Sequence, residues 1–133
     1  MLTGACLCGA IRFKLTGPIE VINCCHCSRC RQRTGSAFAT IAHANLDHFE
    51  YTAGEDLIES FTPDDWNVRR FCRICGSPLP GTNEEDKEVG IPVGLLDQDP
   101  GVRPSLHIMV ESKAPWYDIA GDETQYETFP EDW

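Results

Sequence analysis

The eight cysteines of the chain fall into three tight groups, and this grouping restricts the possible folds more than any other feature. Cys6 and Cys8 form a C-x-C pair, and Cys72 and Cys75 form a C-x-x-C pair. The other four cysteines lie within seven residues: Cys24, Cys25, Cys27 and Cys30. Thiolates spaced by one or two residues can converge on one zinc ion, at Zn–S distances of about 2.3 Å. The pattern predicts one closed metal site and a second site of a different kind.

Disulfide bonds are the main alternative, because eight is an even number of cysteines. A disulfide needs a Cα separation of about 4.4–6.8 Å, and adjacent cysteines such as Cys24 and Cys25 rarely meet this requirement with each other. The segment MLTGACLCGA has no basic region followed by an apolar run, so we expect no secretory signal and a cytoplasmic location. Clustered cysteines in an intracellular chain are typical of metal binding, and we therefore expect thiols that hold metal.

The net charge of −10 is unevenly distributed along the chain. Residues 1–46 contain five basic residues and one acidic residue, whereas residues 47–133 contain six basic and twenty acidic residues. A chain this acidic should be repelled by nucleic-acid phosphates, because proteins bind these phosphates through Lys and Arg side chains. No apolar run approaches the roughly 20 residues that a membrane-spanning helix needs. We expect neither nucleic acid nor membrane as a partner.

The hydrophobic pattern is mainly that of β-structure. Ile11, Phe13 and Leu15 alternate with polar residues, which is the period of a half-buried strand. Further short strands are expected at Val21–Cys24, Ala37–Ala44, His48–Thr52, Leu57–Phe61, Trp66–Phe71, Val89–Val93 and His107–Val110. Residues 28–34 and 46–49 could each form one helical turn, and nothing in the chain has a long helical period.

The length of 133 residues fits one domain with a hydrophobic core of its own. Nine prolines and eleven glycines are spread along the chain, as expected for many tight turns in a β domain. We predict a single zinc-binding β domain over residues 1–121. The acidic residues that follow predict a loosely held C-terminal tail over residues 122–133.

The first and last cysteine pairs are more than sixty residues apart, and a metal that joins them would cross-link distant segments. Such a cross-link is what a structural zinc contributes to folding. A redox C-x-x-C pair would be expected to open a helix, whereas Pro78 and the surrounding strand pattern argue against a helix here. We therefore assign Cys6, Cys8, Cys72 and Cys75 to one closed zinc site.

The central cluster offers three thiols to a second metal. In an extended segment Cys25 and Cys27 lie on one face, while Cys24 and His26 lie on the other. Cys30 can fold back through a turn to join the first two. Three protein ligands and one open position are typical of catalytic zinc, and an iron–sulfur cluster is less favoured because suitable partner spacing is absent. Cys24 is interpreted as a buried thiol and His26 as a structural neighbour, with a ligand role for His26 as the alternative.

Five segments resemble one known family. They are GACLCGAIRF, CHCSRCRQRTGS, FCRICGSPL, VGLLD and HIMVESKAPW, in this order from Gly4 to about Trp116. Together they resemble the glutathione-dependent formaldehyde-activating enzyme and centromere protein V family. The resemblance implies a β-tent fold of several coiled antiparallel sheets with two zinc ions, one structural and one labile. It also implies that glutathione and formaldehyde combine to S-hydroxymethylglutathione at the zinc held by Cys25, Cys27 and Cys30.

Two departures from the family accompany the resemblance. Cys24 stands where relatives more often carry a residue without a thiol, and the segment after Asp122 is unusually acidic. Neither departure removes one of the implied zinc ligands.

The second site would suit chemistry between a thiol and an aldehyde. Zinc with an open position lowers the pKa of a bound thiol, and a thiolate adds readily to an aldehyde carbonyl. We therefore predict a zinc-dependent carbon–sulfur lyase-type enzyme. The alternative is a non-catalytic zinc module that binds a protein partner.

Six of the eleven basic residues lie in or beside the cysteine groups: Arg29, Arg31, Arg33, Arg69, Arg70 and Arg73. From proximity in sequence, Arg29 and Arg31 are candidates to hold a carboxylate of the thiol substrate, and Ser36 is a candidate to donate a hydrogen bond to it. The last three arginines of the set are interpreted as offsetting the negative charge of a zinc–thiolate centre.

Overall fold

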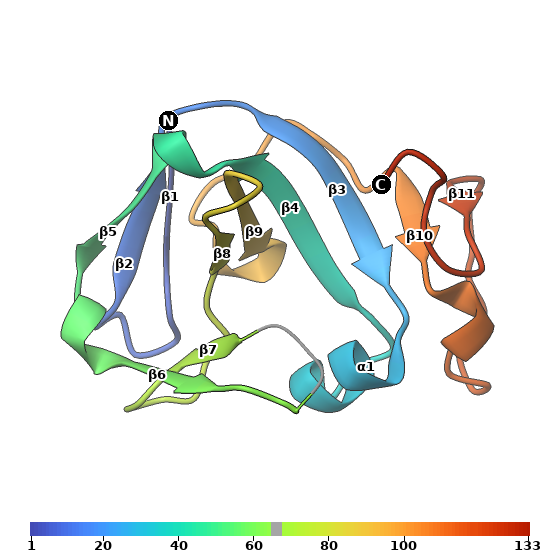
Figure 1. The fold of residues 1–133 in the computed structure, drawn as a ribbon, viewed down its shortest axis with the longest axis horizontal. Helices are drawn as coiled ribbons and strands as arrows, with labels where there is room; N and C mark the ends of the chain where they lie inside the picture. The colour runs from blue at the N-terminus through green and yellow to red at the C-terminus, as the bar shows by residue number, and fades with distance from the viewer. Residues whose placement is uncertain (65–67) are drawn as a thin grey trace.

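The computed structural model describes residues 1–64 and 68–133, and its elements are mostly short strands (Figure 1). The strands are β1 (Leu2–Ala5), β2 (Arg12–Leu15), β3 (Ile19–Cys25), β4 (Ala39–Asn45), β5 (Phe49–Ala53), β6 (Ile58–Phe61), β7 (Arg69–Cys72), β8 (Gly81–Asn83), β9 (Glu88–Pro92), β10 (Leu106–Ile108) and β11 (Thr124–Gln125). The described part has one α-helix, α1 (Ser28–Thr34). Single 3₁₀ turns are found at Leu46–His48, Glu55–Leu57, Val93–Leu95 and Val110–Ser112. No helix in these two ranges is both long and apolar enough to cross a bilayer.

The strands form three sheets. One has the order β1-β2-β5, the largest has the order β11-β10-β3-β4-β9-β8, and β6 pairs with β7. Most neighbours are antiparallel, but β10 runs parallel to both β3 and β11. The prediction of a mainly β fold with several sheets and few helical turns is confirmed, with the correction that the largest sheet is mixed rather than wholly antiparallel.

The two larger sheets lean together at the end that carries the N-terminus, and β6, β7 and α1 lie across the opposite end (Figure 1). The main core fills the space between these sheets. Phe13 and Leu15 of β2 point into it, and they pack with Ile22, Val89 and Ile91 of the six-stranded sheet. The period-2 alternation in β2 therefore predicted the buried face correctly.

The strands with a clear apolar alternation were predicted, and the remaining ones were not. No strand is predicted at β1, β8 or β11, which are short and are held in place by pairing with neighbouring strands. The expected helical turn at residues 28–34 is α1. The expected strand Trp66–Phe71 begins outside the described residues, and its described part overlaps β7, which ends one residue later at Cys72.

The C-terminal segment is attached to the sheet edge. Thr124 and Gln125 form β11 beside β10, and the Tyr126 amide donates to the His107 carbonyl oxygen at 2.9 Å. Further along, the Met109 amide donates to the Thr128 carbonyl oxygen at 2.9 Å. The expectation of a loosely held tail is wrong for these residues, because they satisfy backbone groups at the edge of β10.

Candidate functional site

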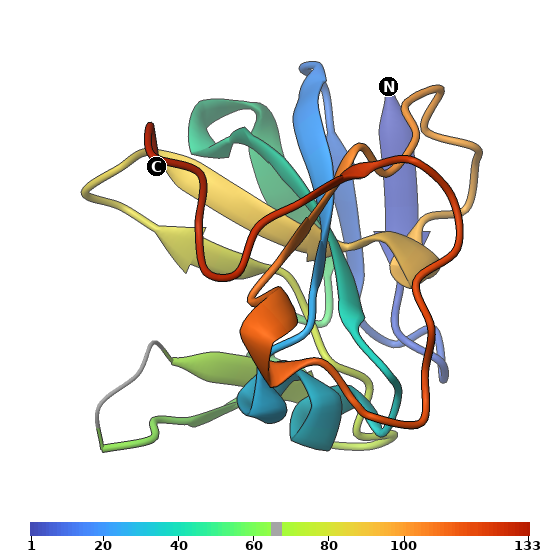
Figure 2. The ribbon, with the colours of Figure 1, turned by 90° about the vertical axis from the view of Figure 1, so that its right-hand side faces the viewer.

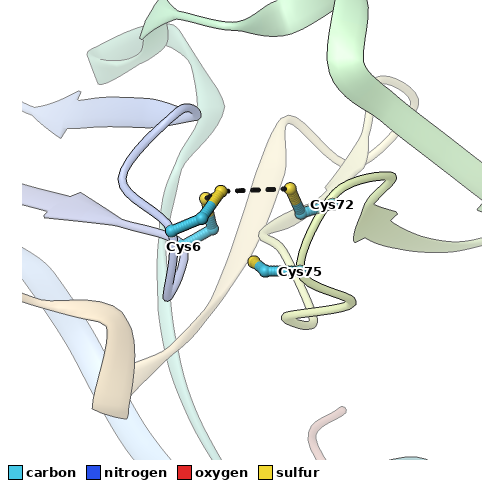
Figure 3. A group of neighbouring side chains, drawn as sticks. Cys6, Cys72 and Cys75 are labelled. Atoms are coloured by element: carbon cyan, nitrogen blue, oxygen red, sulfur yellow. Dashed lines mark hydrogen bonds between the residues drawn. The ribbon is translucent and has the colours of Figure 1, made fainter.

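The first and last cysteine pairs meet in space, as Figure 3 shows for Cys6, Cys72 and Cys75. The four Sγ atoms of Cys6, Cys8, Cys72 and Cys75, hereafter the four-cysteine group, all lie within 4.8 Å of one another. The Cys8 Sγ lies 3.5 Å from that of Cys6 and 3.8 Å from that of Cys72. Tetrahedral zinc with Zn–S bonds of about 2.3 Å places its sulfurs about 3.8 Å apart, so the donor set fits zinc.

Two tight turns bring these thiols together. Gly9 and Gly76, at φ +80° and +77°, occupy the left-handed region that glycine adopts most readily. Their amides donate to the carbonyl oxygens of Cys6 and Cys72, at 3.0 and 2.8 Å. Ser77 also hydrogen-bonds with Cys75, which lowers the pKa of Cys75 to about 5. The turns thus bring the four thiols of the two pairs together in a geometry that could hold one metal ion.

The central cluster converges where β3 meets α1. Cys25 ends β3, Cys27 is the N-cap residue of α1, and Cys30 lies in the first turn of the helix. These three thiols, hereafter the three-cysteine group, are only 5–8 % exposed, and their Sγ atoms lie within 4.8 Å of one another. Within residues 1–64 and 68–133 no further His, Cys, Asp or Glu completes this group. Three thiols without a fourth protein donor fit a metal that keeps an open position.

Hydrogen bonds polarise the three-cysteine group. Hydrogen bonding with Cys25 and Cys30 lowers the pKa of Cys27 to about 2, and the Cys30 amide donates to the Cys27 Sγ at 3.3 Å. The side chains of Ala39 and Ile108 pack against the group. The thiolate form that binds metal is therefore favoured at Cys27 within a largely apolar shell.

Cys24 and His26 lie apart from the three-cysteine group. His26 is fully buried, and its Nε2 lies 2.7 Å from the Nδ1 of His107 on β10. Burial lowers the pKa of His26 to about 4, while burial also raises the pKa of Cys24. The ring of Phe38 packs against His26 with centroids 5.0 Å apart. This placement matches a structural histidine pair more closely than a metal ligand.

Three arginines line a cavity of about 200 Å³ between α1 and β7. They are Arg33 of α1 and Arg69 and Arg70 of β7, and we call the space the arginine cavity. Arg29, Arg31 and Ser36, the candidates from sequence, do not line it. Arg33 was not among those candidates, although it follows Cys30 by three residues and so shares a helix face with it.

A larger cavity of about 620 Å³ is also lined by Arg70. It lies among β5, β6, β7 and β8 and is lined in part by Glu50, Glu55 and Glu84. Arg70 lines both cavities, whereas the candidate residues Arg29 and Arg31 line neither. The acidic lining of the larger cavity contrasts with the cationic lining of the smaller one.

Comparison with known proteins identifies the family to which the chain belongs. Residues 1–112 match the family model described as "Glutathione-dependent formaldehyde-activating enzyme", and the chain belongs to this family. It is similar to a protein of Halomonas elongata named "Putative glutathione-dependent formaldehyde-activating enzyme", with 30% identity over an alignment of 136 positions that covers 92% of this chain and 83% of the relative. The fold is also similar to a crystal structure of a Rhodobacter sphaeroides protein, with a TM-score of 0.58 and 27% identity over 77% of this chain and 91% of that one.

Proposed function

We propose that the chain is a zinc-dependent carbon–sulfur lyase-type enzyme that acts on the adduct of glutathione and formaldehyde. Three buried thiols without a fourth donor among the described residues support this proposal most directly. Membership of the family supports glutathione as the thiol and formaldehyde as its partner. The activity would resemble that of S-(hydroxymethyl)glutathione synthase.

The two cysteine groups would have different tasks. The four-cysteine group would hold a structural zinc that joins the turn after β1 to β7. The three-cysteine group would hold a second zinc, which supplies an open coordination position and lowers the pKa of a thiol placed there. Cys27, whose pKa is held low by its two neighbours, would keep its thiolate form and anchor that metal.

In the reaction the glutathione thiol loses its proton and its sulfur forms a bond to the aldehyde carbon. The carbonyl π electrons move to the oxygen, which takes up a proton, and the reverse reaction breaks the same carbon–sulfur bond. Arg33 and Arg69 would place positive charge beside the developing negative charge, because both interact electrostatically with the three-cysteine group. The buried, apolar shell of that group would strengthen this interaction by excluding water.

Location and domain limits follow as further proposals. Reduced thiols persist in the cytoplasm, where glutathione and thioredoxin keep cysteines free of disulfides, so we place the protein there. Residues 1–121 would form the zinc-binding domain, and residues 122–133 would form an acidic C-terminal segment that covers the edge of β10.

The variant Cys27→Ser tests the proposal. It should lower the zinc content by one ion per chain and reduce the exchange of formaldehyde with glutathione, followed by NMR exchange spectroscopy, to the uncatalysed rate. Cys24→Ser is the matched control, because Cys24 is a buried thiol of β3, three residues before Cys27, but lies outside the three-cysteine group. A Cys27→Ser protein that exchanges as fast as the wild type would refute the catalytic role and favour a non-catalytic zinc module.

A further inference from the structure

The four-cysteine group is buried on one side and open to solvent on the other. Among the eight cysteines, all of which lie in the described residues, Cys8 alone is exposed, whereas Cys6 and Cys72 are only 4 % and 0 % exposed. The turn that carries Cys8 projects into solvent, because Leu7 is 86 % exposed and a Cβ added at Gly9 would meet no atom within 4 Å. A small dissolved molecule can therefore reach Cys8 without any movement of the fold.

Two further thiols lie within reach of Cys8. Its Sγ is 3.5 Å from the Sγ of Cys6 and 3.8 Å from the Sγ of Cys72. Cys72 lies opposite the turn that carries Cys6 (Figure 3). The Leu7 amide donates to the Ser77 Oγ at 2.9 Å, which holds the two turns together independently of a metal. Exposed thiolates beside a second, resolving cysteine are the ones that peroxides oxidise most readily, and Cys8 has both properties.

The three-cysteine group lacks this exposure. Its thiols are only 5–8 % exposed, and Ala39 and Ile108 belong to the same buried cluster. Met109 and Tyr126 pack against that cluster, and Tyr126 belongs to the C-terminal segment. Figure 2 shows this segment, in red, lying over the side of the six-stranded sheet that carries β3 and β10. A dissolved oxidant should therefore react at the four-cysteine group first.

We propose that Cys8 is a site of oxidation by peroxides and that Cys72 resolves the oxidised sulfur, so that a Cys8–Cys72 disulfide takes the place of the metal. The Cys8 thiolate gives an electron pair to one oxygen of hydrogen peroxide. The S–O bond forms, the O–O bond breaks, and a hydroxide ion leaves a sulfenic acid at Cys8. The Cys72 thiolate then attacks the Cys8 sulfur and displaces the second hydroxide ion. Two thiolates are thus oxidised to one disulfide, and the peroxide is reduced to two hydroxide ions.

Cys72 is preferred to Cys6 as the resolving cysteine because it belongs to the other turn. Cys6 and Cys8 share one turn, which the Gly9 amide closes by donating to the Cys6 carbonyl oxygen at 3.0 Å. Bringing these two sulfurs to the S–S bond length of about 2.05 Å would distort that turn. A small shift of one turn toward the other brings Cys8 and Cys72 together instead.

The disulfide would preserve the cross-link that the metal provides. It joins the turn after β1 to β7 at the same two positions and so closes the same loop of 64 positions. Once Cys8 and Cys72 are joined, only Cys6 and Cys75 remain as donors, which are too few for a closed structural zinc site. Oxidation therefore replaces the metal with a covalent bond while the fold is kept.

Peptide mapping of the oxidised protein tests the proposal. The zinc-loaded full chain is treated with an equimolar amount of hydrogen peroxide, and released zinc is measured with a colorimetric chelator. The protein is then unfolded, free thiols are alkylated, and disulfides are located by mass spectrometry. We expect a Cys8–Cys72 disulfide, loss of zinc in proportion to the disulfide formed, and alkylated thiols at Cys25, Cys27 and Cys30.

Three results of the mapping would overturn the inference. They are a disulfide between Cys6 and Cys8, an oxidised cysteine in the three-cysteine group, and eight free thiols after treatment. The mapping reports neither lyase activity nor the second metal, so a failure of the proposed function would leave its result unaffected.

Two variants assign the reaction to the exposed thiol. Cys8→Ser should lose the peroxide-dependent disulfide altogether. Cys24→Ser is the matched control and should form the disulfide to the same extent as the wild type, because Cys24 is buried and belongs to neither cysteine group. Loss of the disulfide in Cys24→Ser would refute the assignment. The wild-type mapping uses no variant, so it decides the matter even where a substitution impairs folding.

Urea unfolding tests whether the disulfide preserves the cross-link. Oxidised protein is compared with and without a reductant, both in the same chelator, so that the two samples differ only in the disulfide. The oxidised sample should have a midpoint about 2 M higher, because its unfolded state keeps the closed loop. Equal midpoints would show that the disulfide does not take over the role of the metal.

Discussion

The four-cysteine group should contribute as much to stability as a fully buried core side chain, and Cys72→Ser tests this. Cys72 is fully buried at the end of β7, and β7 pairs with β6 in a sheet of two strands. Isolated two-stranded sheets are marginal in water, so the attachment of β6 and β7 should depend on the metal that joins them to the turn after β1. Loss of one ligand removes this cross-link.

The magnitude follows from the length of chain that the cross-link closes. Cys8 and Cys72 are separated by 64 positions, and closing a loop of that length removes about 4 kcal/mol of unfolded-state entropy at 25 °C. Domains of this size have unfolding free energies of about 5–15 kcal/mol, so this is a large share of the total. With a urea m-value of about 2 kcal/mol/M, the midpoint should fall by about 2 M.

Urea unfolding followed by circular dichroism, with zinc content measured on the same samples, is the assay. Cys24→Ser is the control, because Cys24 is buried but belongs to neither cysteine group, and its cost should be about 1 kcal/mol. A Cys72→Ser protein with less zinc but an unchanged midpoint would show that the four-cysteine group does not cross-link the fold.

Three further outcomes follow from the packing and the backbone. Ile91→Ala empties a fully buried position in β9 and should cost about 2–5 kcal/mol of unfolding free energy in urea, with both cysteine groups still binding zinc. Gly54→Ala places a Cβ 2.1 Å from the Ala10 carbonyl oxygen at φ +73°, so its thermal midpoint should fall by several degrees, and an unchanged midpoint would contradict the tight approach. Truncation after Gly121 removes β11 and should raise the hydrogen-exchange rates of the Met109, Val110 and Glu111 amides, which donate to carbonyl oxygens of the removed segment, whereas unchanged rates at residues 109–111 would contradict the attachment of the segment.

Local spacing explains why the cysteine groups could be predicted. Cys25 and Cys27 share a face because strand side chains alternate. The helical turn that follows Cys27 brings the Cys30 thiol close to the other two. Predicting that the two outer pairs meet required one further assumption. It was that two closely spaced pairs, far apart in the sequence, bind the same metal ion. The structure brings each predicted set within 4.8 Å.

Long-range pairing explains what the sequence did not reveal. β8 is Gly-Thr-Asn and β11 is Thr-Gln, so neither has an apolar alternation that would predict a strand. Both are strands because they pair with neighbouring strands of the sheet. The arginine cavity was missed for a similar reason. Arg33 lies far in sequence from Arg69 and Arg70, and only the fold brings the three together. The sequence alone suggests for Arg69 and Arg70 no more than an offset to the negative charge of a zinc–thiolate centre.

Zinc content per chain is the most direct measurement of the central claim, that the three-cysteine group holds a metal of its own. Elemental analysis of protein purified without chelator from zinc-supplied cells should give two zinc ions per chain. One zinc ion per chain in the wild type would contradict the claim, because the four-cysteine group alone would then account for all of the metal.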